Sequence, residues 1–314
     1  MGLEEVLIVG GGAVGTLIAH ALIESGVRPY VLFKDRQQLL LVEKSGLKLH
    51  LTDGSVAVVN DAHFITYEEL KRLRAFELIV IATKAYDFSE ALKSVSTHLS
   101  PEGVLLTCQN GLRSYEEALE TLGPSKAAAL VLNHGVYRVR SHEFEWIGGS
   151  TSYLGSRGVS AELLKRISSL LKILSVNAVN DIEPYRWIKL SVNAAVNPLT
   201  ALHGVKNKYI VMDENLFKAA VKVVEEVRDV AEKFNVRFYE DPLEEMVRVV
   251  KATGENYSSM CQDLMNGRRT EVDYINGEVV VRGKRVGVET PFNELLWLMI
   301  KFKESRGMKS GGVN

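Results

Sequence analysis

The chain has 314 residues, of which 46% are hydrophobic and 25% charged, a composition typical of a globular protein of about two domains. Its formal net charge of −1 provides no overall field that would attract nucleic acid or an anionic membrane surface. The two cysteines, Cys108 and Cys261, lie far apart without metal-ligand spacing, which favours a reduced cytoplasmic protein with no bound metal. A basic leader segment and a run of about 18 apolar residues are both absent, so we expect neither secretion nor a membrane span.

The first half of the chain alternates short apolar runs with helical patterns. We predict strands at residues 6–9, 30–33, 47–51, 56–59, 78–82, 104–107, 127–132, 143–147, 151–154 and 176–179, and helices at residues 13–25, 89–98 and 161–174. Residues 52–55 join two of these strands and indicate a hairpin turn. Strands that alternate with helices favour a doubly wound, mostly parallel sheet.

From residue 181 onward the apolar spacing is mostly helical. We predict helices at residues 184–195, 214–234, 242–252, 257–265, 271–282 and 291–303. The change of pattern predicts an α/β domain over residues 1–180 and an all-α domain over residues 181–306. Residues 307–314 are rich in glycine, serine and lysine, and we expect a flexible tail there.

A glycine-rich segment lies between the first predicted strand and the first predicted helix. It has the spacing G-x-G-x-x-G and consists of Gly10, Gly11, Gly12, Ala13, Val14 and Gly15. In this strand–turn–helix context the pattern is typical of a dinucleotide site. Gly10 would permit the tight turn, Gly12 would let the backbone approach a pyrophosphate, and Gly15 would let the helix pack on the strand. A glycine-rich turn without a ligand is the alternative.

Charged residues follow the second predicted strand, where such sheets select between NAD and NADP. Lys34 and Arg36 flank Asp35 at this position. A basic residue would bind the 2′-phosphate of NADP, whereas an acidic residue would bind the ribose hydroxyls of NAD. The two cations favour NADP, Asp35 leaves NAD open, and a solvated turn is the third interpretation.

Two more polar residues follow predicted parallel strands. Lys84 comes after the strand at residues 78–82, and Asn110 comes after the strand at residues 104–107. Ligands usually bind at this edge of such sheets. Lys84 would neutralise a phosphate or a carboxylate, and Asn110 would hydrogen-bond the nicotinamide ribose; alternatively, the pair Asn110-Gly111 is only a turn.

The first helix of the second half carries a polar flank. Lys189, Asn193 and Asn197 recur at intervals of four residues, and each step advances about 40° around a helix. Pro198 follows at once, which predicts a kink or an end of the helix there. A buried lysine beside two amides is costly unless it is used, and burial would lower its pKa toward the range of a proton donor. A surface lysine whose stem covers apolar residues is the alternative.

A second polar segment lies further on. Residues 256–263 indicate a helix whose small polar side chains would bind a carboxylate. Thr270 can then cap a helix that begins at Glu271, where the helix dipole stabilises an anion. On the residues alone, a glutamate at a helix start without any role in a site is the favoured interpretation.

Taken together, these segments give the chain a family resemblance. It resembles ketopantoate reductase (2-dehydropantoate 2-reductase) over nearly its whole length. The matching segments are GGGAVG at residues 10–15, TKAYD at 83–87, QNG at 109–111, RWIKLSVNAAVNPLTAL at 186–202, ENYSSMCQDL at 255–264 and RRTEVDYINGEVV at 268–280. The resemblance implies an N-terminal Rossmann domain and a helical C-terminal domain, with the active site in the cleft between them. It also implies that NADPH reduces the C2 carbonyl of a small-molecule 2-oxo acid, 2-dehydropantoate, to give pantoate for coenzyme A biosynthesis.

The resemblance further implies roles for single residues. Lys189 matches the catalytic lysine that protonates the developing alkoxide, and Glu271 matches its partner beside the nicotinamide. Positions that match substrate-binding residues are Asn193, Asn197, Asn207, Asn256, Ser258 and Ser259, with Ser259 as the expected carboxylate ligand. Positions on the cofactor side, besides the glycine-rich segment and Glu271, are Lys34, Lys84, Asn110 and Val136. A homodimer through the helical domain is compatible with the resemblance.

Three other functions stay open. One is a reductase of another branched 2-oxo acid, and one is a two-domain dehydrogenase of the 3-hydroxyisobutyrate or glycerol-3-phosphate kind. The third is a protein that senses NAD(P) without catalysis.

Overall fold

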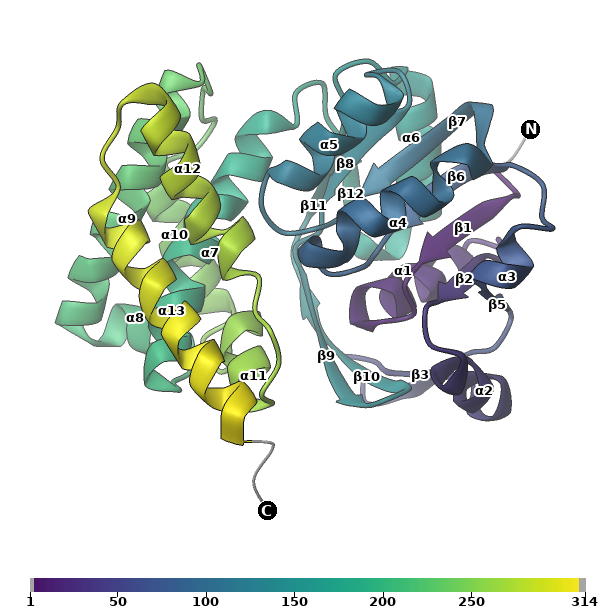
Figure 1. Cartoon of the computed structure of the whole chain (residues 1–314), viewed down its shortest axis with the longest axis horizontal. Coiled ribbons are helices and arrows are strands. Elements are labelled where there is room, and N and C mark those ends of the chain that lie inside the picture. The colour runs from purple at the N-terminus through teal and green to yellow at the C-terminus, as the bar shows by residue number, and fades with distance from the viewer. Residues whose placement is uncertain (1–2, 311–314) are drawn as a thin grey trace. The chain divides into compact units, whose positions relative to one another are not determined.

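The computed structural model describes residues 3–310 of the chain, with side chains up to residue 306. It divides into two compact units (Figure 1). The first unit holds Met1–Gln109 and Ser114–Ile182, and the second holds Asn110–Arg113 and Glu183–Asn314. The boundary predicted at residues 180–181 lies close to this division. The sequence pattern does not predict that Asn110–Arg113 packs with the second unit.

An eight-stranded sheet forms the centre of the first unit, in the order β12-β11-β8-β7-β6-β1-β2-β5. All neighbouring strands pair in parallel except β8 and β11, which are antiparallel. The predicted doubly wound, mostly parallel sheet is therefore confirmed. The strands are β1 (Val6–Val9), β2 (Tyr30–Phe33), β5 (His63–Thr66), β6 (Phe76–Ile81), β7 (Leu99–Thr107), β8 (Ala127–Val131), β11 (Ser152–Gly155) and β12 (Val176–Ala178).

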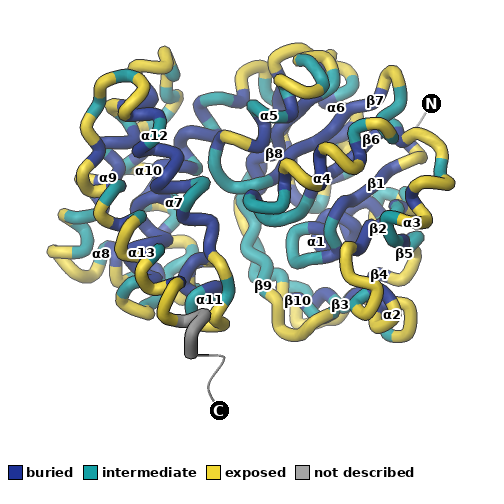
Figure 2. Tube along the Cα trace, viewed as in Figure 1, coloured by how far each residue is buried: buried dark blue, intermediate teal, exposed yellow. Residues whose placement is uncertain are grey.

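Helices accompany this sheet and bury its central strands, so that β1 and β8 are buried along their whole length. Figure 2 shows these strands as the dark interior of the unit. The helices are α1 (Ala13–Ile23), α2 (Arg36–Ser45), α3 (Tyr67–Leu70), α4 (Phe88–Val95), α5 (Arg113–Leu122) and α6 (Ala161–Leu170). The sequence pattern does not predict α2, α3, α5 or the edge strand β5.

A second, four-stranded sheet has the order β4-β3-β10-β9 and packs against α1. Its strands are β3 (Leu47–His50), β4 (Val56–Val59), β9 (His134–Arg140) and β10 (Glu143–Gly149). The predicted hairpin forms, with Gly54 at a φ of +85° in its turn, but it belongs to this separate sheet. Strand β9 is not predicted, because it is largely exposed and carries charged residues.

The second unit is helical, as predicted. Its helices are α7 (Glu183–His203), α8 (Tyr209–Met212), α9 (Glu214–Lys233), α10 (Pro242–Ala252), α11 (Ser259–Met265), α12 (Asn276–Val286) and α13 (Pro291–Ser310). Helix α7 is mostly buried and contacts α9, α10, α11 and α13, so it forms the core of this unit (Figure 2). Asp213 and Asp241 cap α9 and α10, whose first N–H groups donate to their carboxylates.

The prediction that α7 kinks or ends at Pro198 is wrong about its end, because the helix continues to His203. Proline lacks the N–H that would donate to the Ala194 carbonyl. The Nδ2 group of Asn276 donates to that carbonyl instead, at 2.9 Å. A side chain from α12 thus replaces the missing backbone hydrogen bond.

The helix predicted at residues 271–282 is interrupted near its start. A 3-10 turn at Val272–Tyr274 comes first, and α12 begins only at Asn276. Ile275 separates the two with φ −111° and ψ −90°, outside the helical region. The Thr270 hydroxyl accepts from the Val272 N–H at 3.2 Å, but the residue at the N-cap of the short turn is Glu271.

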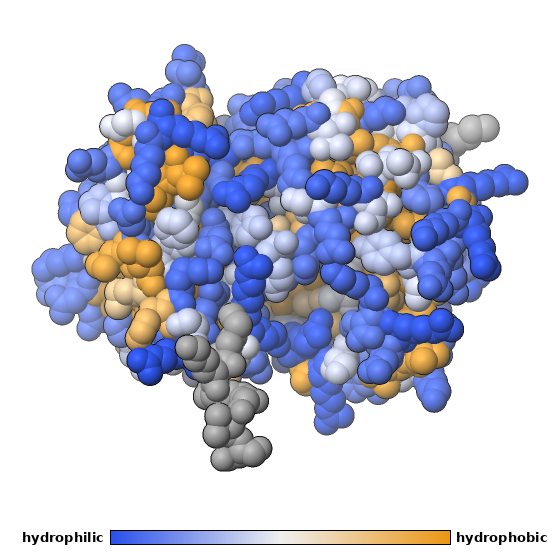
Figure 3. All heavy atoms as spheres, viewed as in Figure 1, coloured by the Kyte–Doolittle hydropathy of each residue, from blue (hydrophilic) through white to orange (hydrophobic). Residues whose placement is uncertain are grey.

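Helix α13 runs to Ser310, so the first residues of the predicted tail at 307–314 continue this helix, while residues 311–314 lie outside the described part. Large apolar side chains of α13 are exposed, and Figure 3 shows hydrophobic patches over part of it. They are Phe292, Leu295, Leu298, Met299 and Phe302. Within residues 3–310, no helix combines the length and apolar character needed to cross a bilayer.

Candidate functional site

The glycine-rich loop of the first unit leads from β1 into α1 with little room for side chains. Gly10 has a φ of +107°, which L side chains rarely adopt, and its N–H donates to the Leu32 carbonyl at 3.0 Å. A Cβ on Gly15 would lie 1.9 Å from the Gly10 carbonyl oxygen. A Cβ on Gly11 would lie 2.2 Å from the Phe33 ring. The turn and its packing therefore require Gly10, Gly11 and Gly15 even without a ligand.

Gly12 differs from these glycines. A Cβ on Gly12 would have one protein atom within 4 Å, the Nη2 of Arg138 at 4.0 Å. Gly12 is also the N-cap residue of α1 and offers no side chain to the N–H groups of the first turn. This combination of open space, free helix N–H groups and helix dipole suits a phosphate group.

Arg138 is a residue that the sequence reasoning missed. It lies on β9, is exposed, and stacks its guanidinium over the Phe144 ring at 5.7 Å. Because it stands beside Gly12, it is a candidate cation for a bound pyrophosphate. Nothing in the sequence points to it, since β9 itself is not predicted. Val136, a predicted cofactor contact, lies on the same strand and packs half-buried against the core.

The three charged residues after β2 have distinct surroundings. Lys34 donates to Glu90 Oε2 at 2.8 Å, and this bond raises the pKa of Lys34, so the side chain is a cation. Asp35 is the N-cap of α2 and accepts from the Gln37 N–H at 2.8 Å. Arg36 is the exposed first residue of α2.

Lys84 lies half-buried just after β6, as predicted for the carboxyl edge of the sheet. Its loop is fastened by Gln109, whose Nε2 donates to the Ile81 carbonyl at 2.7 Å and to the Thr83 carbonyl at 3.0 Å. The segments that follow β6 and β7 are therefore tied together, and Gln109 is the link.

Asn110 belongs to the second unit, where it joins two of the predicted site residues. Its Oδ1 accepts from Asn193 Nδ2 at 3.3 Å, and its Nδ2 donates to Glu271 Oε2 at 3.0 Å. Glu271 is only 7% exposed. The next residue, Gly111, has a φ of +86°, and a Cβ there would lie 2.2 Å from the Tyr274 carbonyl. This turn therefore permits the close approach that brings Asn110 to Glu271.

Further contacts anchor the short segment Asn110–Arg113 within the second unit. Arg113 donates twice to one oxygen, Oε2, of Glu278 on α12, from Nε at 3.1 Å and from Nη2 at 2.7 Å. The buried Arg186 of α7 donates to the Leu112 carbonyl and pairs with Glu183. Arg186 belongs to the segment 186–202 that matches the family, and these contacts show that it holds this loop.

Lys189 lies half-buried on α7, one turn before Asn193. Residues four apart share a helix face, so Lys189 and Asn193 lie on the same flank, as does the buried Asn197. The second unit thus carries an ammonium group, three amides and a buried carboxylate on three segments that are distant in sequence. Such a set can donate a proton and orient a polar substrate.

Ser258 and Asn207, two predicted substrate ligands, make structural contacts. Ser258 caps α11 by accepting from the Cys261 N–H, and its hydroxyl lies 2.8 Å from that of Thr200 on α7. Asn207 donates from Nδ2 to Thr253 Oγ1 at 3.1 Å, while its buried Oδ1 has no partner among the described residues.

The remaining predicted ligands lie nearby in this segment. Asn256 is half-buried, and its carbonyl accepts from the Asn207 N–H at 2.9 Å. Ser259 is exposed at the first position of α11. Its exposure leaves it accessible to a ligand, in contrast to Ser258.

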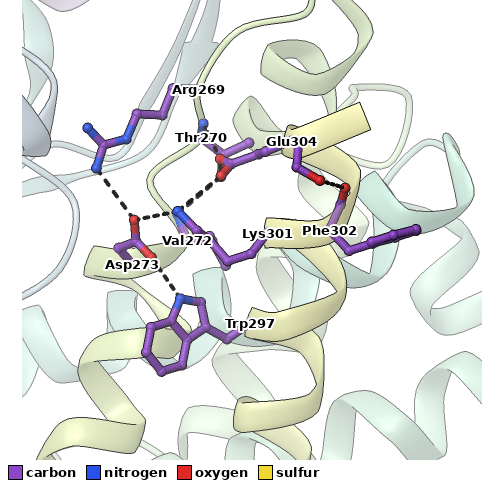
Figure 4. A network of polar contacts seen from close by, with 9 residues as sticks. Arg269, Thr270, Val272, Asp273, Trp297, Lys301, Phe302 and Glu304 are labelled. Atoms are coloured by element: carbon purple, nitrogen blue, oxygen red, sulfur yellow. Dashed lines mark hydrogen bonds and ion pairs between the residues drawn. The ribbon is translucent and has the colours of Figure 1, made fainter. Parts of the chain in front are cut away.

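The residues on both sides of Glu271 are held by α13 (Figure 4). Thr270 donates its N–H and its hydroxyl to Glu304 Oε1, at 2.7 and 2.6 Å. Asp273 accepts from Trp297 Nε1 at 2.8 Å and from Lys301 Nζ at 3.0 Å. Lys301 also pairs with Glu304 at 3.3 Å. The segment that carries Glu271 is therefore anchored to α13 on both sides of this residue, through Thr270 and Asp273.

Within this anchor, Asp273 and Lys301 form an ion pair at 3.0 Å. Burial disfavours the charged form of Asp273, but hydrogen bonds from Trp297, Lys301 and Arg269 and the charge of Lys301 outweigh burial and lower the pKa of Asp273. Burial likewise opposes the charge of Lys301, yet its contacts with Asp273 and Glu304 raise its pKa. Both partners are charged at neutral pH.

Comparison with known proteins places this chain among enzymes. Residues 6–158 match the family "Ketopantoate reductase PanE/ApbA", and residues 181–304 match "Ketopantoate reductase PanE/ApbA C terminal". A 2-dehydropantoate 2-reductase of Pyrobaculum aerophilum is 38% identical over 301 residues, which cover 95% of this chain and 97% of that protein.

Solved structures share the fold. A PanE/ApbA family ketopantoate reductase from Ralstonia eutropha JMP134 has a TM-score of 0.84 at 23% identity, covering 97% of this chain and 99% of its own. A D-mandelate dehydrogenase in a ternary structure with NADH and anilino(oxo)acetate has a TM-score of 0.87 at 22% identity, with the same coverage. The matched residues span both units, and the chain belongs to the ketopantoate reductase PanE/ApbA family.

Proposed function

We propose that this chain catalyses the NADPH-dependent reduction of the C2 ketone of 2-dehydropantoate to pantoate, the step that the resemblance implies. Family membership over both units and the relative in Pyrobaculum aerophilum support this reaction. The observation that carries the catalytic part is the chain of hydrogen bonds Asn193–Asn110–Glu271, in which Asn193 lies one turn after Lys189 on α7.

The residues of the first unit fit a dinucleotide. The N–H groups at the start of α1 and the space above Gly12 would hold the pyrophosphate, with Arg138 as an added cation. Lys34 would bind the 2′-phosphate as a point charge, and Lys84 would neutralise a further anionic group. When bound, the reduced nicotinamide supplies the hydride.

Lys189 acts in this proposal as the general acid. Arrival of a hydride at a ketone carbon leaves negative charge on the oxygen, and an ammonium group already in place stabilises that charge and supplies the proton. General-acid catalysis of this kind contributes roughly 10²–10⁴ in rate. Glu271, which matches the partner of the catalytic lysine in the resemblance, is the carboxylate that this proposal places beside the Lys189 ammonium.

Asn110 orients Glu271 and Asn193 for this task. It occupies one carboxylate oxygen of Glu271 and fixes the amide of Asn193. Asn193 and Asn197 would then hydrogen-bond the polar groups of the substrate, and the exposed Ser259 would bind its carboxylate. Ser258, Asn207 and Asn256 would serve the substrate by holding the segment that carries Ser259.

An assay of cofactor oxidation tests the proposed function. The chain is incubated with 2-dehydropantoate and NADPH or NADH, and in parallel with other branched 2-oxo acids and with the 2-oxo acid that corresponds to mandelate. We expect kcat/KM for 2-dehydropantoate to exceed that for the other acids by at least about tenfold. Higher kcat/KM for another 2-oxo acid would reassign the substrate, and no oxidation with any of them would favour a sensing protein.

The match of both units to one family argues against a dehydrogenase of the 3-hydroxyisobutyrate or glycerol-3-phosphate kind. The same assay run in the oxidative direction with 3-hydroxy acids would reveal such an activity. A homodimer stays a prediction, and sedimentation analysis of the full chain would decide it.

A further inference from the structure

The Lys34 ammonium, which would bind a 2′-phosphate, is already paired with a carboxylate in this structure. Lys34 stands just after β2, and Glu90 lies in the first turn of α4, after β6. Their charged atoms are 2.8 Å apart, and both side chains are more than two-thirds exposed. The pair therefore lies on the surface of the first unit, where an incoming phosphate would meet both charges.

We propose that Glu90 determines cofactor specificity in this chain, by holding Lys34 and by repelling a 2′-phosphate, so that NAD(H) is accepted alongside NADP(H). The inference rests on the proposed function, because it assumes that the first unit binds a nicotinamide dinucleotide with its ribose beside Lys34.

The charges around Lys34 support this role. Glu90 contacts the Lys34 ammonium directly, and Asp87 is close enough for its charge to act on it as well. Glu90 lies in the first turn of α4, at the positive end of the helix dipole. A 2′-phosphate, which carries roughly −1.5 to −2 charges, would enter this acidic setting. The ribose hydroxyls of NAD are neutral and meet no such repulsion.

The neighbouring residue Asp35 has a different role from Glu90, because it does not pair with Lys34 in any contact described above. One of its carboxylate oxygens accepts from the Gln37 N–H and so caps α2. Its position is fixed by the helix start, whereas Glu90 reaches Lys34 from another helix. Because the Lys34–Glu90 pair is exposed, it is weak, and a phosphate can displace the carboxylate rather than be excluded by it.

The test measures the affinity of the full chain for NADP⁺ and NAD⁺ by calorimetry, without substrate. Glu90→Gln keeps the size of the side chain and its hydrogen bond to Lys34 but removes the charge. We expect the ratio of the NAD⁺ Kd to the NADP⁺ Kd to rise about three- to tenfold, mainly through tighter NADP⁺ binding. The increase should shrink at high salt, because the charges are exposed.

Glu162→Gln is the matched control, since Glu162 is also an exposed first-turn acid, on α6 of the same unit. Its ratio of Kd values should equal that of the wild type. Lys34→Met should lower the affinity for NADP⁺ more than the affinity for NAD⁺. Adding Glu90→Gln to the Lys34→Met variant should increase NADP⁺ affinity less than Glu90→Gln does in the wild type.

An unchanged or lower ratio in Glu90→Gln would overturn the inference, and so would an equal change in Glu162→Gln. If neither nucleotide bound the wild type, the inference and the proposed cofactor would both be wrong. If the ratio shifted as expected but no 2-oxo acid were reduced, the inference would stand and the proposed reductase function would fail.

Discussion

The side-chain amide of Asn276 donates to the Ala194 carbonyl at 2.9 Å, where the backbone N–H of an ordinary residue 198 would have donated. The same amide donates to Asn293 Oδ1 at 3.0 Å, and Asn293 in turn bonds Glu226. All of these side chains are buried. A polar network from three helices therefore lets α7 continue past Pro198, and it carries Asn197 within an unbroken helix.

We predict that Asn276→Ala lowers the free energy of unfolding by about 2–3 kcal/mol, because it leaves the Ala194 carbonyl and the Asn293 side chain without a donor in the core. Denaturant unfolding measures the change. In a Pro198→Ala background the loss should be smaller, since alanine restores a backbone donor to Ala194. Equal losses in both backgrounds would show that the two sites are not coupled.

The glycine loop allows a comparison of two alanine substitutions. Gly12→Ala should leave thermal stability nearly unchanged but weaken dinucleotide binding about tenfold or more, since its Cβ would occupy the space proposed for the pyrophosphate. Gly15→Ala should destabilise the fold itself, because its Cβ would overlap the Gly10 carbonyl. Thermal unfolding and nucleotide titration of both variants check this, and unchanged nucleotide affinity in Gly12→Ala would contradict the proposed position.

Asn110 should affect catalysis through the groups that it orients. We predict that Asn110→Ala lowers kcat/KM for the 2-oxo acid by about 10–100-fold, because Glu271 loses a hydrogen bond and Asn193 loses its acceptor. Asn110→Asp should be worse, since it adds a carboxylate beside Glu271. Steady-state kinetics give both values. A kcat/KM equal to that of the wild type in the aspartate variant would show that Asn110 does not orient the catalytic groups.

Asp273 should contribute to stability in a pH-dependent way. Its folded-state pKa lies below the ordinary value of 3.8, so its ionised form stabilises the fold fully above pH 3.8. That contribution is lost as the pH falls through the lowered pKa, because the protonated acid no longer pairs with Lys301. Unfolding measured between pH 7 and pH 3 should therefore show a shallower acid destabilisation in Asp273→Asn. Parallel curves for the variant and the wild type would contradict this.

The sequence pattern predicts those parts of the fold that depend on local periodicity. Buried strands such as β1 and β8 are continuous apolar runs, and amphipathic helices such as α9 show their spacing directly. Strand β9 is missed because its exposed residues lack such a run. The continuation of α7 is missed because the donor to Ala194 comes from a residue 82 positions later, which no local pattern reveals.

The candidate site shows the same division. The types of residue in the site and the conformations of its glycines follow from the sequence. The side chains and backbone groups that each site residue contacts do not. Asn110 follows a strand of the first unit, yet packs with the second through Gly111 and Arg113. Ser258 and Ser259 are adjacent in sequence, and only the fold shows that one hydroxyl is buried as a cap while the other is exposed.

Turnover of the Lys189→Ala variant is the decisive test of the proposed mechanism. With 2-dehydropantoate and saturating NADPH, we predict a kcat at least about 10²-fold below that of the wild type, with the Kd for the dinucleotide unchanged. Near-normal kcat in a folded variant would show that another group protonates the alkoxide, and that Lys189 is not the general acid.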